Sequence, residues 1–175
     1  MTQLGLEPTY LLDSCCVVNL DNKHRHPNVP PEFDDVERES IWNGLEALAN
    51  DGFLKLIKQV KGELTDWHPS GLRRLAAFSG AKYALKRSER VVREYQRVVQ
   101  AYPDLINKSK RDDPADPWLI TVARLHGWHI LTEEFPMSSR SLKATRELRI
   151  PDVCTREGIQ CTNLRTLARS KGWLR

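Results

Sequence analysis

Short apolar runs alternate along the chain with longer stretches in which apolar residues recur every three or four positions. Residues 9–13, TYLLD, form an apolar run that ends in a carboxylate, and its length favours a buried strand over a helix. Residues 21–33 are rich in Pro and predict a loop, after which Asp34 or Asp35 can cap a helix. That helix ends near Gly52 and places five apolar residues on one face, namely Ile41, Trp42, Leu45, Leu48 and Ala49.

A second strand and a long helical region follow. Residues 53–60, FLKLIKQV, alternate between apolar and polar positions, which predicts a strand with Phe53, Leu56 or their neighbours facing a core. From residue 63 to residue 102 the pattern is helical and stops before Pro103. Breaks in this region are expected at Pro69, Gly71 and Gly80.

The clearest helix signals lie between residues 115 and 132. Asp116 is a good N-cap and Pro117 a good first helical residue, and the amphipathic run WLITVARLH leads to Gly127 at the C-terminal end. Residues 128–132, WHILT, predict a third strand directly after this helix.

The last part of the chain follows the same order of helix and strand. After a basic stretch of helical character, residues 150–152 open a short helix that Gly158 ends. Residues 159–164 predict a fourth strand, and a helix closes the chain. Strands and helices that alternate with short connections indicate a three-layer α/β/α fold with a central, mainly parallel sheet of four to five strands.

Length and composition are those of one folded domain. A domain of 175 residues buries roughly 70% of the surface of its unfolded chain, which is enough for a core of its own. No linker divides the chain, so we predict a single domain over residues 1–175. No apolar run has the length of a bilayer span, and the start, MTQLGLEPTY, lacks the regions of a secretory leader. We therefore expect a cytoplasmic protein without a membrane partner.

Net charge and cysteine content say little about the function. A formal charge of +4 and a pI near 8.9 fit a polyanionic partner, but they are common among proteins that bind none. The four cysteines lack the spacing of a metal or redox motif and the density of a disulfide scaffold. We expect Cys15, Cys16, Cys154 and Cys161 to be reduced, buried side chains.

Carboxylates follow the predicted strands at the edge where open parallel sheets bind ligands. These acids are Asp13, Glu63, Asp116, Glu133, Glu134 and Asp152. Mg²⁺ and Mn²⁺ prefer oxygen ligands, and either ion can activate water for phosphodiester hydrolysis. The combination of acids therefore predicts a metal-dependent nuclease site.

Each acid also has a plainer interpretation. Asp116 alone could be only a helix cap, and Asp152 after Pro151 only a helix-start residue. Glu63, Glu133 and Glu134 alone are typical solvated charges. Asp13 fits that interpretation least, because it directly follows the apolar run YLL at the end of a strand.

Five segments in order resemble the motifs of PIN-domain ribonucleases. They are LLDSCCVVNL, the GEL at residues 62–64, ADPWLI at 115–120, LTEE at 131–134 and IPDVC at 150–154. They resemble more closely a PIN-like bacterial family of unassigned function, whose members carry an ADPFLI-type segment and an IPDVC-type segment before a final strand. The resemblance covers nearly the whole chain and implies a single PIN-like domain.

The resemblance also implies an activity and its residues. Asp13, Glu63 and Asp116 match the metal-binding acids of the family, and the late motifs would add Glu134 and Asp152. Ser14 would support the metal shell. PIN domains usually carry Thr-x-Asp where this chain has Thr132 followed by Glu134, whose side chain is one methylene longer.

The same resemblance implies partners. The expected activity is hydrolysis of RNA by an endoribonuclease that uses Mg²⁺ or Mn²⁺. Many similar proteins are toxins of type II toxin-antitoxin pairs, which implies a small antitoxin protein as a partner and a homodimer.

Basic residues supply a candidate RNA contact. Arg140, Lys143, Arg146 and Arg149 recur every three residues between two acid-bearing motifs, where a phosphate backbone could run. A basic run on an exposed helix is also typical of a solvated face.

Other functions remain open or are disfavoured. His24 and His26 lack the paired spacing of a zinc site, and no Walker loop or dinucleotide fingerprint is present. LLDSC lacks the second Asp that a haloacid-dehalogenase-like phosphatase needs. A catalytically inactive module that binds RNA or protein stays open, as does a structure-specific DNA nuclease, because metal sites read phosphates rather than bases.

Overall fold

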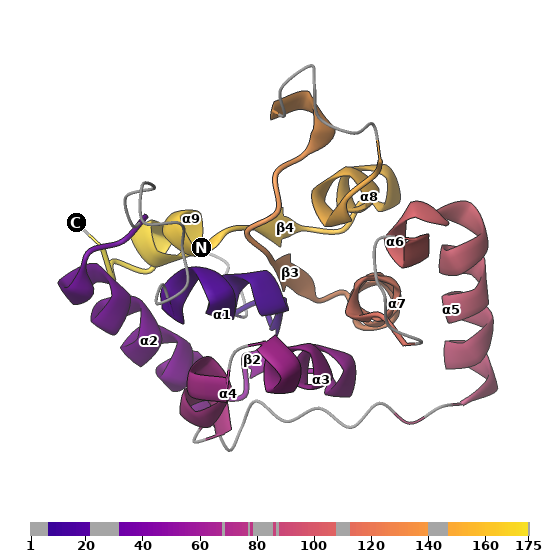
Figure 1. Cartoon of the computed structure of the whole chain (residues 1–175). Helices are drawn as coiled ribbons and strands as arrows, with labels where there is room; N and C mark the ends of the chain where they lie inside the picture. The colour runs from indigo at the N-terminus through magenta and orange to yellow at the C-terminus, as the bar shows by residue number, and fades with distance from the viewer. Residues whose placement is uncertain are drawn as a thin grey trace, which may run out of the picture.

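Four short parallel strands lie side by side at the centre of the fold in the computed structural model of the chain (Figure 1). The structure describes residues 7–21, 32–67, 69–76, 78, 86, 88–107, 113–139 and 147–174. The strands are β1 (Tyr10–Leu12), β2 (Leu54–Lys55), β3 (His129–Leu131) and β4 (Cys161–Thr162), in the order β2-β1-β3-β4. Leu11 pairs with Lys55 on one side and with Ile130 on the other. The predicted parallel sheet is confirmed, with four strands.

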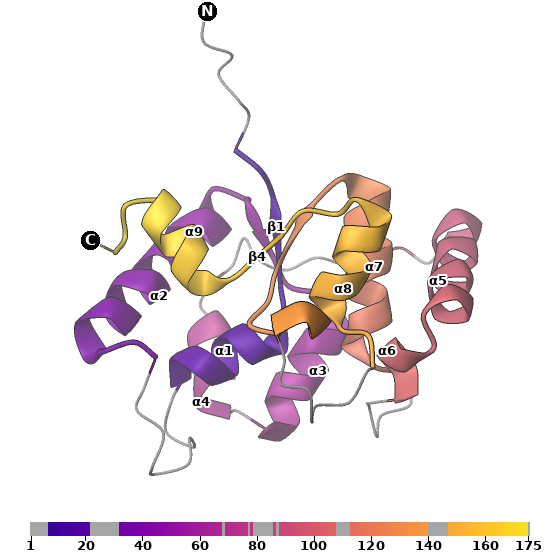
Figure 2. The same cartoon turned by 90° about the horizontal axis from the view of Figure 1, so that it is seen from above.

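Helices cover both faces of this sheet (Figures 1 and 2). One face carries α1 (Ser14–Asp21), α2 (Asp35–Asn50) and α9 (Leu164–Ser170), and the other carries α7 (Ala115–His126) and α8 (Ile150–Glu157). Four further helical segments and a short 3₁₀ helix complete the described part of the chain: α3 (Lys58–Trp67), α4 (Pro69–Ala76), α5 (Glu89–Ala101), α6 (Asp104–Asn107) and η2 (Met137–Ser139). The three-layer α/β/α fold is therefore confirmed.

The helix α2 forms as its pattern predicts. Asp34 is the N-cap, and its carboxylate accepts a hydrogen bond of 2.8 Å from the backbone N–H of Glu37. The Glu37 carboxylate accepts one in return from the N–H of Asp34 at 3.1 Å, which completes a capping box. The predicted apolar face is buried in full, namely Ile41, Trp42, Leu45, Leu48 and Ala49.

Two predicted strands are shorter than their apolar runs. Residues 53–60 were expected to form one strand, but β2 ends at Lys55 and α3 begins at Lys58. Ile57, Val60 and Leu64 are buried, and their spacing of three and four residues is helical, so this part of the prediction was wrong. The fourth strand likewise ends before Leu164, because Asn163 caps α9 by accepting a hydrogen bond of 2.8 Å from Thr166 N.

The helices α1 and α4 correct two further expectations. No helix was predicted directly after Asp13, yet α1 begins at Ser14 and buries Cys16, Val17 and Leu20. Gly71 was expected to break a helix but lies within α4, where α1 packs closely against it. A Cβ at Gly71 would lie 2.4 Å from Cγ1 of Val17, so only Gly permits this approach.

The helix α7 begins two residues earlier than expected. Pro114 occupies the N-cap position and Ala115 is the first helical residue, so the prediction of Asp116 as the cap was wrong. Asp116 lies in the first turn, where the helix dipole favours a carboxylate. Gly127 ends α7 with φ +67°, as predicted, and Gly158 ends α8 in the same way with φ +68°.

Several expectations fall outside the described residues. They are the Pro-rich loop between residues 22 and 31, including His24 and His26, the break at Gly80, and the basic residues Arg140, Lys143 and Arg146. None of the helices that the structure describes combines the length and the apolar character that a bilayer crossing demands.

The order of the strands creates one preferred place for a ligand. From β1 the chain leads through α1 and α2 to β2 on one side, whereas from β3 it leads through α8 to β4 on the other side. Ligands of open α/β sheets bind beyond the carboxyl ends of the strands where the order reverses in this way. That place lies beyond Leu12 of β1 and Leu131 of β3, and the helices α1 and α3 approach it in Figure 2.

Candidate active site

Asp13 directly follows β1 and lies beside the end of β3. Its backbone N–H donates to the carbonyl of Leu131 at 3.0 Å, which continues the pairing of the two strands by one residue. Its side chain is only 4% exposed. The hydroxyl of Thr132, the residue after β3, donates to Asp13 Oδ2 at 2.6 Å. The two strand ends therefore hold this carboxylate between them.

The thiol of Cys15 provides a second donor to the same oxygen. Cys15 Sγ lies 2.8 Å from Asp13 Oδ2 and also accepts a hydrogen bond of 3.0 Å from the N–H of Glu133. Burial raises the pKa of Cys15 to about 11, so the thiol keeps its proton at neutral pH and can donate it. Cys15 was expected to be only a small buried apolar residue, and the structure gives it this polar contact as well. None of the four cysteines forms a disulfide, as expected, but only Cys16 and Cys154 are buried, whereas Cys15 and Cys161 are partly exposed.

Asp13 is electrostatically strained in spite of these donors. Burial raises the pKa of its carboxyl to about 6, hydrogen bonds from Cys15 and Thr132 oppose that rise, and the charges of Glu134 and Glu63 add to it. A cation close to Asp13 would stabilise its ionised form, because the positive charge offsets both the loss of hydration on burial and the repulsion from the two neighbouring carboxylates.

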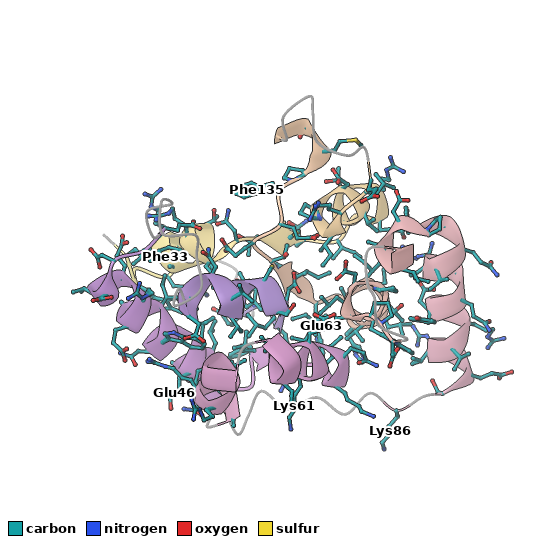
Figure 3. All side chains as sticks on the ribbon, viewed as in Figure 1. Phe33, Glu46, Lys61, Glu63, Lys86 and Phe135 are labelled. Carbon is teal, nitrogen blue, oxygen red and sulfur yellow. The ribbon has the colours of Figure 1, made fainter. Side chains whose placement is uncertain are left out.

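Ser14 connects Asp13 to Glu63. The Ser14 hydroxyl donates to Glu63 Oε2 at 2.7 Å and lies 3.4 Å from Asp13 Oδ1. Glu63 Oε1 accepts a hydrogen bond of 3.2 Å from the N–H of Ala115, the first residue of α7. Glu63 was expected just past the second strand, but it belongs to α3 and reaches between α3 and α7 (Figure 3). Asp116, the residue after Ala115, lies in the turn of α7 that Glu63 contacts.

Glu134 is the acid after β3 whose charge acts on Asp13. Its backbone N–H donates to Thr132 Oγ1 at 3.2 Å, so one threonine hydroxyl positions both residues. Its carboxylate is held by Arg149 Nη1 at 3.1 Å and by the N–H of Ile150 at 2.9 Å. The Glu134 carboxylate is therefore bound at the start of α8, and its charge acts on Asp13.

Glu133 and Asp152 have other contacts. Glu133 accepts hydrogen bonds from the N–H of Leu164 at 2.7 Å and from the side chain of Asn19 at 2.8 Å, which ties α9 and α1 to the end of β3. The oxygens of Asp152 accept from the N–H of Arg149 at 2.9 Å and from that of Met137 at 2.7 Å. These contacts favour the interpretation of Asp152 as a helix-start residue of α8.

The donor set at Asp13 fits a hard divalent cation. Among the residues that the structure describes, no three His, Cys, Asp or Glu side chains form a ready metal-binding group. Mg²⁺, however, is commonly bound through one or two carboxylates, keeps several waters and takes further oxygens from substrate phosphates. Asp13 and Glu63, which share Ser14, would be such a pair of ligands.

Sequence reasoning missed part of the support around this site. Neither the thiol contact of Cys15 nor the role of Asn19 in holding Glu133 was expected. The helix that carries both residues could have been predicted, because Cys16, Val17 and Leu20 are spaced for one buried helical face directly after Asp13. That helix turns Ser14 and Cys15 back toward the end of β1.

These features define a three-layer α/β/α protein with a buried carboxylate at the switch point of a parallel sheet. Residues 10–174 match the family described as a domain of unknown function (DUF4411), and the chain belongs to this family. No curated protein matches the chain.

Proposed function

We propose that this protein is an endoribonuclease that depends on Mg²⁺ or Mn²⁺ and cuts RNA at the Asp13 site. The observation that carries the proposal is the position of Asp13, a 4%-exposed carboxylate at the end of β1 that is connected to Glu63 through the Ser14 hydroxyl. Burial and the charges of Glu134 and Glu63 raise the pKa of this carboxyl. An ionised carboxylate that is buried without a cation lowers the free energy of unfolding. Groups of this kind are common at functional sites.

Each residue of the site would have a separate role in binding the metal ion and the substrate. Asp13 offers the oxygen that Ser14 approaches, because Thr132 and Cys15 both bind the other one. Ser14 and the N–H of Ala115 orient Glu63. A divalent cation held there supplies an activated water and shields the charge that develops on a phosphate. Asp116, at the start of α7, would be the third carboxylate of the site beside Asp13 and Glu63.

The choice of RNA and the biological role rest on the resemblance to PIN-domain ribonucleases. On that basis we propose that the protein is the toxin of a type II toxin-antitoxin pair, forms a homodimer and is held inactive by a small antitoxin protein. Expression of the chain should then arrest growth, and co-expression of a small neighbouring open reading frame should relieve the arrest.

The test is a cleavage assay with matched variants. The parent should cut single-stranded RNA in Mg²⁺ or Mn²⁺ and lose activity in a chelator, whereas Asp13→Asn and Glu63→Gln should reduce cleavage by at least a hundredfold. Glu46→Gln is the control, because Glu46 lies on α2 away from Glu63 (Figure 3). Single- and double-stranded DNA substrates of the same sequence distinguish an RNase from a DNase. Equal activity of the parent and of both site variants would refute the proposal.

A second candidate is a catalytically inactive PIN-like module that binds RNA or protein. One observation favours it: Glu134 and Asp152 already have protein donors on both of their carboxylate oxygens. A parent protein that binds RNA with equal affinity in Mg²⁺ and in chelator, without cutting it, would support this candidate instead.

A further inference from the structure

Phe135 exposes a large apolar side chain a few residues past the end of β3, the strand that lies beside Asp13. It follows Glu134 in the chain, and 64% of its surface is in solvent. Figure 3 shows it beside the segment after β3, standing clear of the helices. Only Glu133 and Glu134 lie between Thr132 and Phe135, so the Cα atoms of Thr132 and Phe135 are at most about 11 Å apart even in an extended chain. The ring therefore lies within the reach of a substrate bound at Asp13.

The backbone around Phe135 is anchored on both sides. Before it, the N–H of Glu134 binds Thr132 Oγ1, and the Glu134 carboxylate binds the N–H of Ile150. After it, the N–H of Met137 binds the carboxylate of Asp152 at 2.7 Å. The exposure of the ring is therefore a property of a segment held in place, and a preorganised aromatic side chain loses little entropy when it binds a ligand.

Arg149 is connected to the Phe135 segment through Glu134. The guanidinium of Arg149 binds Glu134, the neighbour of Phe135, and the Arg149 side chain is still 37% exposed. An aromatic face beside an accessible cation is the pairing that proteins use for single-stranded nucleic acid, in which bases stack and phosphates seek positive charge.

Few exposed apolar side chains accompany Phe135 in the part of the chain that the structure describes. Among the residues that the structure describes, the other exposed large apolar side chains are Val18 on α1, Val36 on α2, Val92 on α5 and Met137, and only Met137 is close to Phe135 in the chain. A stable protein interface buries on the order of 1,200–2,000 Å² around an apolar centre. One ring and one partly exposed Met supply much less than that.

We infer that Phe135 is a stacking platform for an unpaired base of the RNA substrate, with Arg149 directed at an adjoining phosphate. This inference rests on the proposed function and adds a specificity element to it: the substrate must be single-stranded next to the bond that is cut. Duplex RNA cannot offer a free base face to the ring, so it should be a poor substrate.

The test measures binding separately from cleavage. In an Asp13→Asn background, a single-stranded RNA with one 2-aminopurine, moved stepwise along the oligonucleotide, reports stacking by fluorescence quenching. Quenching should be strongest at one position. Phe135→Ala should abolish it there and weaken binding roughly tenfold, within the range known for base–aromatic stacking. Phe135→Tyr should restore both, and Val36→Ala, on α2, should change neither.

An abasic RNA completes the cycle. When the base at the position of strongest quenching is removed, the protein with Phe135→Ala and the protein that keeps Phe135, both in the Asp13→Asn background, should bind the RNA with equal affinity. If Phe135→Ala retains full quenching and affinity while the active parent still cuts RNA, the stacking inference is wrong and the proposed function stands. If the substitution spares RNA binding but prevents inhibition by the antitoxin, the ring belongs to a protein interface and the inference is also overturned. A parent that neither binds nor cuts RNA would refute both.

Discussion

Asp13 stores unfavourable electrostatic energy in the folded protein. Its folded-state pKa of about 6 lies above the ordinary value of 3.8, so the native state holds more protons than the unfolded state between these two values. Stability should therefore fall as the pH rises through this window, and the loss is complete above pH 6. Two pKa units correspond to about 3 kcal/mol.

Asp13→Asn should remove this cost. The amide oxygen can still accept the hydrogen bonds of Thr132 and Cys15, but the side chain carries no charge at any pH. We expect the variant to gain up to about 3 kcal/mol over the parent at pH 7–8 and almost nothing at pH 4. Urea unfolding from pH 4 to pH 8 in chelator measures this difference. Parallel stability curves for the two proteins would show that the charge of Asp13 is not strained.

At the scale of elements, the position of Asp116 in the first turn of α7 allows two roles, stabilisation of the helix and binding of a metal ion, that substitutions can distinguish. Because Pro114 is the N-cap, Asp116 does not cap α7, and its charge near the N-terminus stabilises the helix by roughly 0.3–1 kcal/mol. Asn and Ala lose that charge equally. A metal ligand, in contrast, loses its charged oxygen in both variants, and a hard divalent cation is then bound more weakly.

We expect Asp116→Asn and Asp116→Ala to lose less than about 1 kcal/mol of stability without metal. Both should nearly abolish cleavage and weaken the stabilisation by Mg²⁺. The measurements are thermal melts with and without Mg²⁺ beside the RNA cleavage assay. Cleavage at the parental rate by either variant would leave Asp116 with a helix role alone.

At the scale of the whole molecule, the buried residues form one continuous hydrophobic cluster that extends from Tyr10 to Leu174. A chain with one core should unfold as a unit, so we expect one thermal transition with equal calorimetric and van't Hoff enthalpies. Two separate transitions would contradict the prediction of a single domain over residues 1–175.

Metal should stabilise that unit. Mg²⁺ at a hundredfold its dissociation constant adds about 2.7 kcal/mol, which corresponds to a rise in Tm of roughly 5–10 °C for a protein of this size. Glu63→Gln should remove most of the rise, whereas Glu46→Gln should keep it. A parental Tm that does not respond to Mg²⁺ or Mn²⁺ would count against the metal site.

Local sequence signals determined the helices and strands of this protein and their order. The apolar run before Asp13, the caps of α2, and the glycines after α7 and α8 act within a few residues, and each predicts its element because hydrogen bonding and side-chain spacing there are local. The alternation of these elements then predicts a parallel sheet covered on both faces. Asp13 at a strand end was visible for the same reason.

Only the tertiary structure decided how the site is assembled. The hydrogen bond from Thr132 to Asp13 joins residues 119 apart in the chain, and the one from Ser14 to Glu63 joins residues 49 apart. Whether Glu133 or Glu134 acts on Asp13 depends on the register of β1 with β3 and on the positions of α8 and α9. Burial of the Asp13 carboxylate likewise needs the helices around it, and local pattern carries no information about such distant neighbours.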